Sequence, residues 1–220
     1  WTALEFLFSV QELGDLDAVE KYVPAYLAPK YPRMLVLDFW KFLLHIRPTF
    51  SEDLKTQIDF RGRAGGRSSC DLAKLLEVCL EAEATNPIKP LIDDYPLLVA
   101  KWRRIRRLKP GDRALFEDVE RFRDRLIYDI RTCYRARNTV VHDAAMSVSE
   151  NVRLLQRLNW MLCACVDTVL FLFSRNSKLG VIDLHRCAEV SWQKWQTIIK
   201  DTTSPCTLQD VVEPQSYFTS

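Results

Sequence analysis

The chain contains little glycine and little histidine for its length. Among 220 residues, 6 are glycine and 3 are histidine. A β-sandwich or barrel of this size needs many glycine turns, so the low glycine content argues against both folds. With three histidines, a multi-histidine metal site is not expected. The 48% apolar fraction and the net charge of +2 exclude an intrinsically disordered chain.

A disulfide framework is also missing. The seven cysteines include no Cys-x-x-Cys pair and follow no regular spacing. An odd and irregular set is typical of reduced thiols in a cytosolic protein. Cys163 and Cys165 are separated by about 200° around a predicted helix, so they cannot bind one metal ion together. We therefore expect a cytoplasmic protein that uses no metal and no other cofactor.

The sequence has no secretory signal pattern at its N-terminus and no long uninterrupted apolar run. The most apolar stretch, residues 158–174, contains Asn159 and Asp167 and is short for a membrane span. We expect it to be a buried helix, and we expect no membrane partner. The first residue is Trp1 rather than methionine, so a fragment of a longer protein or a processed product is expected.

Proline is absent from most of the second half of the chain. Eight of the ten prolines lie between positions 24 and 110, and residues 111–204 contain none, which allows long uninterrupted helices there. Apolar residues recur at helical spacing and no segment alternates like a strand, so the sequence predicts an all-α fold. The expected helices are residues 2–12, 15–27, 33–46, 51–60, 68–84, 97–108, 112–137, 147–174 and 184–200.

The predicted helix that begins at position 112 carries one apolar stripe at intervals of three and four residues. Arg137 occupies the next step of this stripe, so its guanidinium is expected to point inward. A buried arginine is costly unless it is paired. A structural ion pair with Asp167 on the following helix is therefore an alternative to a functional role. The stripe consists of Leu115, Val119, Phe122, Leu126, Ile130 and Tyr134.

A break is predicted at residues 138–146, and Ser147 with Glu150 then matches a capping box that starts the next helix. Residues 137–142 read Arg-Asn-Thr-Val-Val-His, an R-N-x-x-x-H sequence at this junction. Together with the long helices before and after it, this sequence resembles the signature of the HEPN superfamily. These are all-α domains whose R-x(4–6)-H motif lies at a helix junction. The resemblance covers residues 101–200.

The residue types of the motif suit RNA cleavage without a metal ion. Histidine, with an ordinary pKa of about 6.5, can act as base or acid near neutral pH. Arginine presents a charged planar fork that matches phosphate oxygens, and asparagine can orient a neighbouring side chain. Structural alternatives remain for the motif residues, since Asn138 is of a type common at helix ends and His142 suits a core or capping position.

The other two histidines lie outside the motif. His45 is expected in the core, and His185 is expected to be structural or exposed.

The resemblance implies a helical bundle of HEPN type with an N-terminal helical extension. Residues 1–96 would be a regulatory or sensor region, residues 97–204 the HEPN-like domain, and residues 205–220 a tail. In active HEPN ribonucleases, two protomers join their motifs across a two-fold axis. The resemblance thus implies a homodimer in which Arg137 stabilises the phosphate, His142 transfers the proton and Asn138 supports both.

The same resemblance implies a reaction and a role. The RNA 2′-hydroxyl would attack the adjacent phosphate, leaving a 2′,3′-cyclic phosphate and a 5′-hydroxyl. HEPN ribonucleases commonly act in bacteria as toxins or in anti-phage defence, on tRNA or other host RNA. An antitoxin or another regulatory partner would then be expected.

Positive charge is concentrated in the second half of the chain. Residues 1–100 contain 11 Lys and Arg against 15 Asp and Glu, whereas residues 101–220 contain 20 against 14. Residues 101–113 carry seven basic side chains and one acidic one, which is typical of a phosphate-contacting surface and also of a solvated helix face. The later arginines are expected to pair with acids three or four residues away. The predicted RNA-binding residues are Lys101, Arg103, Arg104, Arg106, Arg107 and Lys109.

Two other classes of function stay open. One is a non-catalytic HEPN-like module that binds RNA or a partner protein and keeps the motif for structural reasons. The other is an all-α nucleic-acid-binding adaptor whose basic run contacts phosphate. No compact helix-turn-helix pattern accompanies that run, which argues against the adaptor.

Overall fold

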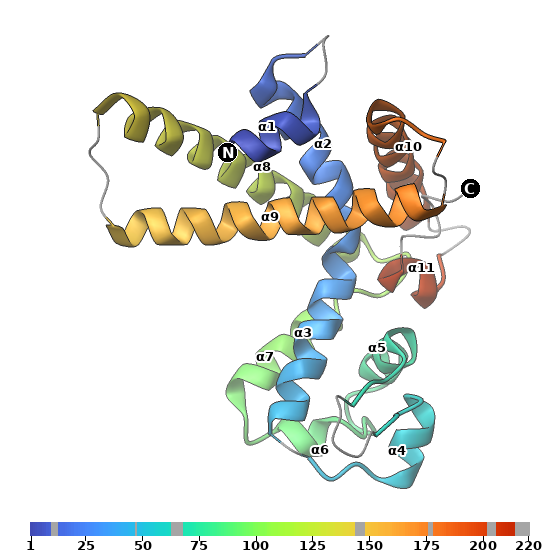
Figure 1. Cartoon of the computed structure of the whole chain (residues 1–220). Coiled ribbons are helices and arrows are strands. Elements are labelled where there is room, and N and C mark those ends of the chain that lie inside the picture. Colours follow the sequence, from blue (N-terminus) through green and yellow to red (C-terminus); the bar gives the residue numbers. More distant parts are fainter. Residues whose placement is uncertain are drawn as a thin grey trace. The chain divides into compact units, whose positions relative to one another are not determined.

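The computed structural model describes residues 1–9, 13–46, 48–62, 68–143, 148–175, 178–201 and 206–213, without the side chains of 140–151. Regular structure in the described part is helical, with one isolated antiparallel bridge between Arg61 and Ser69 (Figure 1). The all-α prediction is confirmed. The helices are α1 (Thr2–Phe8), α2 (Asp15–Leu27), the 3-10 helix η1 (Ala28–Lys30), α3 (Tyr31–His45), α4 (Glu52–Gln57), α5 (Leu72–Leu80), α6 (Lys89–Ile92), α7 (Pro96–Ile105), α8 (Arg113–Asp143), α9 (Val148–Arg175), α10 (Val181–Lys200) and α11 (Leu208–Val212).

Local capping explains where several of these helices begin. At the start of α5, the Asp71 carboxylate accepts hydrogen bonds from the backbone N–H groups of Ala73 and Lys74, at 2.9 and 3.1 Å. At the start of α11, Thr207 and Asp210 form a complete capping box. The predicted bounds of α2 are confirmed. The short helix α6 lies between the predicted helices 68–84 and 97–108, where no helix was expected, and α11 lies in the segment that we expected to be a tail.

Helix α8 extends further than the sequence predicted. It continues to Asp143, so the predicted break at 138–146 does not begin at Asn138. No glycine or proline occurs between positions 112 and 179, and the Thr139 hydroxyl donates to the Arg135 carbonyl of the same helix at 3.1 Å. Residues 137–142 therefore all belong to one helix. The predicted capping box at Ser147 lies outside the described residues.

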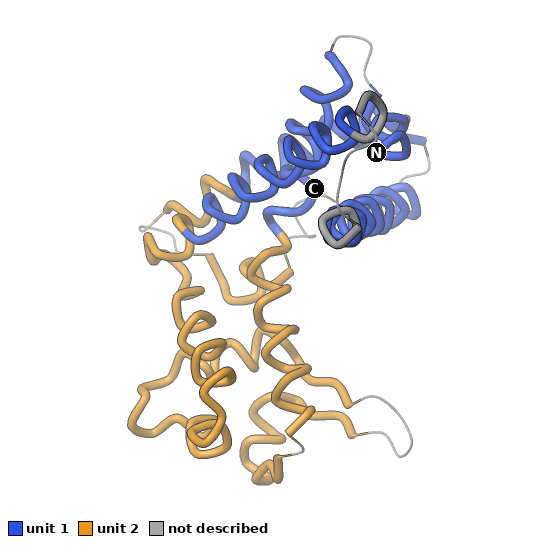
Figure 2. Tube along the Cα trace, turned by 90° about the vertical axis from the view of Figure 1, so that its left-hand side faces the viewer, with its two compact units in different colours: residues 1–29, 118–195, 215–220 blue, residues 30–117, 196–214 orange. Residues whose placement is uncertain are grey.

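The chain forms two compact units, each built from segments that are distant in sequence (Figure 2). Unit 1 contains residues 1–29 and 118–195, and unit 2 contains residues 30–117 and 196–214. These units do not coincide with the expected division into 1–96 and 97–204. The physical reason is that α1 and α2 supply apolar side chains to the same core as α8, α9 and α10.

The core of unit 1 joins α1 and α2 to the three long helices. Phe8 of α1 is 0% exposed, and its ring centroid lies 4.9 Å from that of His185 on α10 and 5.8 Å from that of Tyr26 on α2. The N-terminal helices are thus part of the core of the unit that carries the R-N-x-x-x-H sequence. The buried residues that α8 and α9 contribute are Leu126, Ile130, Cys133, Met161, Cys165 and Leu172.

Helix α9 is buried on one face only. Met161 and Cys165 face the core, whereas Leu155 and Leu170 are 63% and 60% exposed. The expectation of a buried helix over residues 158–174 is therefore wrong for its outer face. Within the described part of the chain, residues Val152–Arg175 of α9 form one helix that is long and apolar enough to cross a membrane, judged by length and composition alone.

His185 is a buried structural residue of unit 1. Its Nε2 donates to the Leu7 carbonyl oxygen at 3.0 Å, and its Nδ1 accepts a hydrogen bond from the Tyr26 hydroxyl at 3.0 Å. The imidazole also packs on the rings of Phe8 and Tyr22, each at 4.9 Å between centroids. Burial lowers the pKa of His185, and the bond to the Leu7 carbonyl opposes this shift without reversing it.

The lowered pKa of His185 predicts that unit 1 loses stability in acid. Below pH about 6.5, the ordinary pKa of histidine, the unfolded chain takes up a proton that the folded core excludes. The free energy of unfolding therefore falls as the pH drops through and below that value. Urea denaturation at about pH 7.5 and about pH 5.5 should show a smaller loss for His185→Gln than for wild type. His45→Gln, at an exposed position, is the control, and an equal loss in all three proteins would contradict this prediction.

Unit 2 is built around α3, which packs against α5, α7 and α11. The indole of Trp40 stacks on Phe50, with 5.9 Å between centroids and 15° between ring planes, and meets the ring of Phe60 edge-on at 6.0 Å. Leu43 and Trp102 are fully buried in the same unit. These aromatic contacts hold one side of α3 in a fixed position.

Candidate active site

Arg137 and Asn138 are neighbours on α8 and interact directly. The Arg137 Nη1 donates a hydrogen bond of 3.0 Å to the Asn138 Oδ1. Arg137 is exposed and Asn138 is half-buried. Because the amide carries no net charge, this contact orients the guanidinium without neutralising it. The charged fork is therefore accessible to a phosphate group in solvent.

The expectation that Arg137 points inward is wrong. The buried core of unit 1 follows α8 through Ile130 and Cys133. One turn before Arg137, the half-buried Tyr134 packs on Trp1 with 5.4 Å between centroids. The Arg137 side chain itself is exposed. The alternative of a buried ion pair with Asp167 also fails, because both side chains are exposed.

His142 lies within α8, but its side chain is outside the part that the structure describes. In a regular helix, position 142 shares a face with position 138, four residues earlier. Position 137 is separated from position 142 by about 140° around the helix axis. One α8 helix therefore does not carry positions 137 and 142 on the same face.

Several other arginines of unit 1 are held by acidic partners. The sequence predicted pairs between residues three or four positions apart in α8, and two pairs at a spacing of three residues are confirmed. Arg135, two residues before Arg137, is exposed on the same helix. The pairs are Arg121 with Asp118, Arg123 with Glu120 at 3.2 Å, Arg131 with Glu20 of α2 at 2.7 Å, and Arg157 of α9 with Asp129.

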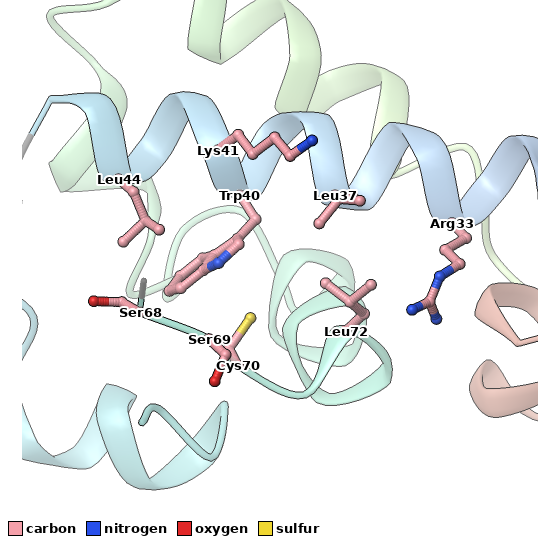
Figure 3. Close-up of a pocket in the computed structure, with 9 residues that line it drawn as sticks. All are labelled: Arg33, Leu37, Trp40, Lys41, Leu44, Ser68, Ser69, Cys70 and Leu72. Atoms are coloured by element: carbon pink, nitrogen blue, oxygen red, sulfur yellow. The ribbon is translucent and has the colours of Figure 1, made fainter. Parts of the chain in front are cut away.

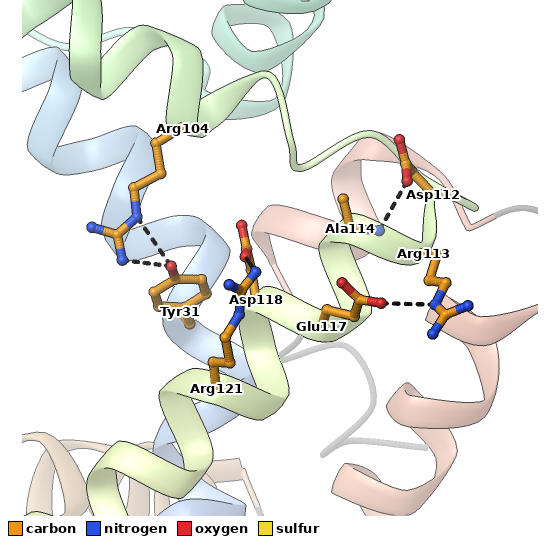
Figure 4. A network of polar contacts seen from close by, with 8 residues as sticks. All are labelled: Tyr31, Arg104, Asp112, Arg113, Ala114, Glu117, Asp118 and Arg121. Carbon is orange, nitrogen blue, oxygen red and sulfur yellow. Dashed lines mark hydrogen bonds and ion pairs between the residues drawn. The ribbon is translucent and has the colours of Figure 1, made fainter.

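The predicted RNA-binding run belongs to unit 2, whereas the R-N-x-x-x-H sequence belongs to unit 1. Within unit 2, some of the cations of this run already have partners. Lys101 pairs with Asp38 of α3. Arg104 donates two hydrogen bonds to the Tyr31 hydroxyl, from Nε at 3.2 Å and from Nη2 at 2.7 Å (Figure 4).

Arg106 caps the C-terminal end of α5. Its Nη1 donates to the backbone carbonyls of Cys79 and Glu81, at 3.1 and 2.6 Å, and its guanidinium lies 4.9 Å from the centroid of the Trp102 ring. The last carbonyls of a helix have no partner within the helix, so a cation there stabilises the helix end. These contacts give Arg106 a structural role. Four members of the run, Arg103, Arg104, Arg107 and Lys109, are exposed.

Arg106 makes structural contacts whereas Arg103 is exposed. We therefore predict that Arg106→Ala destabilises unit 2 while Arg103→Ala does not. Arg106→Ala removes two charge-assisted hydrogen bonds and a ring contact, which should lower the free energy of unfolding by about 1–3 kcal/mol. Arg103 lies one turn earlier and is exposed, so Arg103→Ala should change that free energy by less than about 0.5 kcal/mol. Chemical denaturation followed by circular dichroism measures both, and equal effects would refute the capping role of Arg106.

Burial makes several thiols poor nucleophiles. All seven cysteines are free, as their irregular spacing predicted. Burial raises the pKa of Cys133 to about 11 and that of Cys70 to about 12, with neighbouring aspartates adding to both shifts. Both are therefore protonated near neutral pH. Within the described ranges, no group of three or more His, Cys, Asp or Glu side chains is arranged to hold a metal ion.

Sequence reasoning missed a pocket in unit 2. It lies between α3 and residues 68–72, and its two basic side chains, Arg33 and Lys41, belong to α3 (Figure 3). No motif marks them, because they are eight residues apart and face a segment that follows almost thirty residues later. The sequence predicted a helix over residues 33–46, but it did not predict which segment faces that helix.

Comparisons of the chain with protein-family models, with curated proteins and with solved structures found no match. The resemblance to the HEPN superfamily therefore depends on residues 137–142 and on the helices around them.

Proposed function

We propose that this protein is a metal-independent endoribonuclease of HEPN type, with Arg137, Asn138 and His142 as its catalytic residues. The observation that carries the proposal is the exposed Arg137 guanidinium, hydrogen-bonded to the amide of Asn138, within an R-N-x-x-x-H sequence on a long helix. Because a neutral partner orients this arginine without neutralising its charge, the guanidinium can bind an incoming phosphate.

The proposed reaction is a transesterification followed by release of the cleaved strand. A histidine takes the proton of the RNA 2′-hydroxyl, and the resulting oxygen attacks the adjacent phosphorus. The bond from phosphorus to the 5′-oxygen breaks, and a second histidine protonates that oxygen. Arg137 offsets the negative charge that develops on the non-bridging oxygens. The products are a 2′,3′-cyclic phosphate and a 5′-hydroxyl.

A homodimer with a composite site supplies the second proton-transfer histidine, which one copy of the motif lacks. The scheme uses two proton-transfer groups, and each copy of the motif contains one histidine. The separation of about 140° between positions 137 and 142 of one helix also favours pairing Arg137 of one protomer with His142 of its partner. Exposed apolar side chains on the same two helices, including Tyr128 of α8 and Leu155 of α9, offer area for such an association.

The remaining features of the proposal follow from the same resemblance. The exposed cations Arg103 and Lys109 would contact RNA phosphates. The biological role would be that of a bacterial toxin or an anti-phage effector in the cytoplasm, acting on tRNA or other RNA and controlled by a regulatory partner.

The role of Arg137 is tested by RNA cleavage in the presence of EDTA. We expect Arg137→Ala to cleave RNA roughly a hundredfold more slowly than wild type, because it removes the charge that stabilises the transition state. Arg135→Ala removes the same charge from an exposed position two residues away, and it should cleave at the wild-type rate. Equal cleavage by Arg137→Ala and Arg135→Ala would refute the site. RNA binding without cleavage by wild type would instead favour the non-catalytic module.

A further inference from the structure

Helix α9 (Figure 1) carries a heptad pattern along one side. From position 152 to position 173, apolar residues recur at alternating intervals of three and four residues, with one asparagine among them. This is the spacing of the a and d positions of a coiled coil, sustained over three heptads. We call these residues the α9 seam. Its a positions are Val152, Asn159, Val166 and Phe173, and its d positions are Leu155, Leu162 and Val169.

The α9 seam borders the core of unit 1 and is open to solvent at both ends. Val152 and Phe173 are each 47% exposed, and Leu155 is 63% exposed. The other apolar members are half-buried, because Leu162 and Val169 also pack at the margin of the core. A band of exposed apolar side chains along a helix of this length marks a surface that contacts another molecule.

The charges of α9 lie away from the seam. Between positions 152 and 173, the charged residues are Arg153, Arg157 and Asp167, and all three occupy b or f positions of the heptad. The e and g positions, which flank the seam, hold only Gln, Cys and Leu. When two identical helices pair in parallel and in register, each residue meets its own copy, so a charge in the seam would meet a like charge. The uncharged seam and flanks are therefore compatible with a second copy of themselves.

Asn159 is the polar residue of the seam. It is exposed, and the Cys163 thiol, which is a weak donor, lies 3.8 Å from its Oδ1. In a parallel pair in register, the two Asn159 amides would face each other and hydrogen-bond, whereas a shifted register would bury each amide against apolar side chains. A lipid surface would likewise leave the amide without a partner. Asn159 thus favours a second α9 helix over a membrane.

We propose that a second copy of this chain docks on the α9 seam, so that the two α9 helices pair in parallel with Asn159 facing Asn159. Valine at two of the four a positions and leucine at two of the three d positions favour a two-stranded parallel pair. The parallel direction places the first residues of both α9 helices at the same end of the dimer. An antiparallel pair would separate them by the length of the helix, about 40 Å.

This pairing gives the proposed homodimer a defined surface, direction and register. The parallel direction agrees with a composite site, because the R-N-x-x-x-H sequence ends at His142 and α9 begins at Val148. The seam depends on residues of α9 alone, and its tests use no RNA. A failure of the pairing is therefore distinguishable from a failure of the proposed ribonuclease activity.

The first test is sedimentation velocity of the full chain between about 1 and 100 μM. Wild type should dimerise with a Kd below about 10 μM. Leu155→Glu places two carboxylates opposite each other in the seam, so it should raise this Kd by at least about a hundredfold. Val190→Glu is the matched control, since Val190 of α10 is 49% exposed and lies outside the seam, and this variant should dimerise like wild type. Circular dichroism shows whether both variants keep the wild-type fold.

The second test measures the direction of the pair by disulfide cross-linking. Identical d positions face each other in a parallel pair, and a disulfide needs Cα atoms within about 7 Å. Leu155→Cys, in a Cys163→Ser background that removes the exposed native thiol of α9, should form a covalent dimer when oxidised with copper phenanthroline. Mass spectrometry should find the disulfide between the two copies of position 155. Val190→Cys in the same background should stay uncross-linked.

Three results would overturn the pairing: a wild type that stays monomeric at 100 μM, a folded Leu155→Glu that dimerises as well as Val190→Glu, or no cross-link between the two copies of position 155. Vesicles of phosphatidylcholine and phosphatidylserine test the other occupant. A monomeric wild type that binds these vesicles, with binding lost in Leu155→Glu, would assign the seam to a membrane and would equally overturn the pairing.

Discussion

We expect His142→Ala to lower the rate of RNA cleavage by about 10²–10⁴-fold while the protein stays folded. The reason is that the proposed mechanism uses the imidazole for proton transfer at both the attacking and the leaving oxygen, and alanine can do neither. Total RNA incubated with EDTA and resolved on a denaturing gel measures the rate. Circular dichroism of the same preparation shows that any loss comes from chemistry.

The matched control for this variant is His45→Ala. His45 was expected in the core, but it is exposed at the end of α3. Its replacement should therefore change neither folding nor cleavage. If His142→Ala cleaved as fast as His45→Ala, the assignment of residues 137–142 as the active site would be wrong.

Phe8→Ala should lower the free energy of unfolding by about 3–5 kcal/mol. Phe8 is fully buried, and its ring packs on Tyr22, Tyr26 and His185, so alanine would leave a cavity between α1, α2 and α10. Chemical denaturation of the full chain measures the change. A large effect would show that the first helix helps to hold together the unit that contains the motif.

Phe6→Ala provides the comparison within the same helix. Phe6 is 87% exposed, so its removal should change the free energy of unfolding by less than about 0.5 kcal/mol. A small and equal effect of the two substitutions would mean that α1 is not part of the core of unit 1. In that case, the division into residues 1–96 and 97–204 would regain support.

Helix positions could be predicted well because their signals are local. The bounds of α2 follow from acidic residues at its start and an apolar stripe along it, and the proline-free region does contain the three longest helices. The end of α8 was placed too early, because the motif was expected at a helix junction. No glycine or proline in that region ends the helix, which favours its continuation.

What the sequence could not predict depends on contacts between distant segments. Arg137 follows the apolar stripe of α8, but it is exposed, and Cys133 is the last buried residue among the side chains of α8 that the structure describes. Arg106 was predicted to bind RNA, whereas it bonds to carbonyls at the end of α5, more than twenty residues earlier in the chain. Neither the exposure of Arg137 nor the carbonyl groups that Arg106 contacts can be recognised from a periodic pattern in the sequence.

The most direct test of the central claim is the chemistry of the RNA ends produced by purified wild-type protein in EDTA. Mass spectrometry of the cleaved fragments distinguishes the possible ends. The proposed mechanism predicts fragments with 2′,3′-cyclic phosphate and 5′-hydroxyl ends, and no cleavage when the nucleotide before the cleaved bond carries a 2′-deoxyribose. Fragments with 5′-phosphate and 3′-hydroxyl ends, or cleavage that continues at the deoxyribose position, would contradict it.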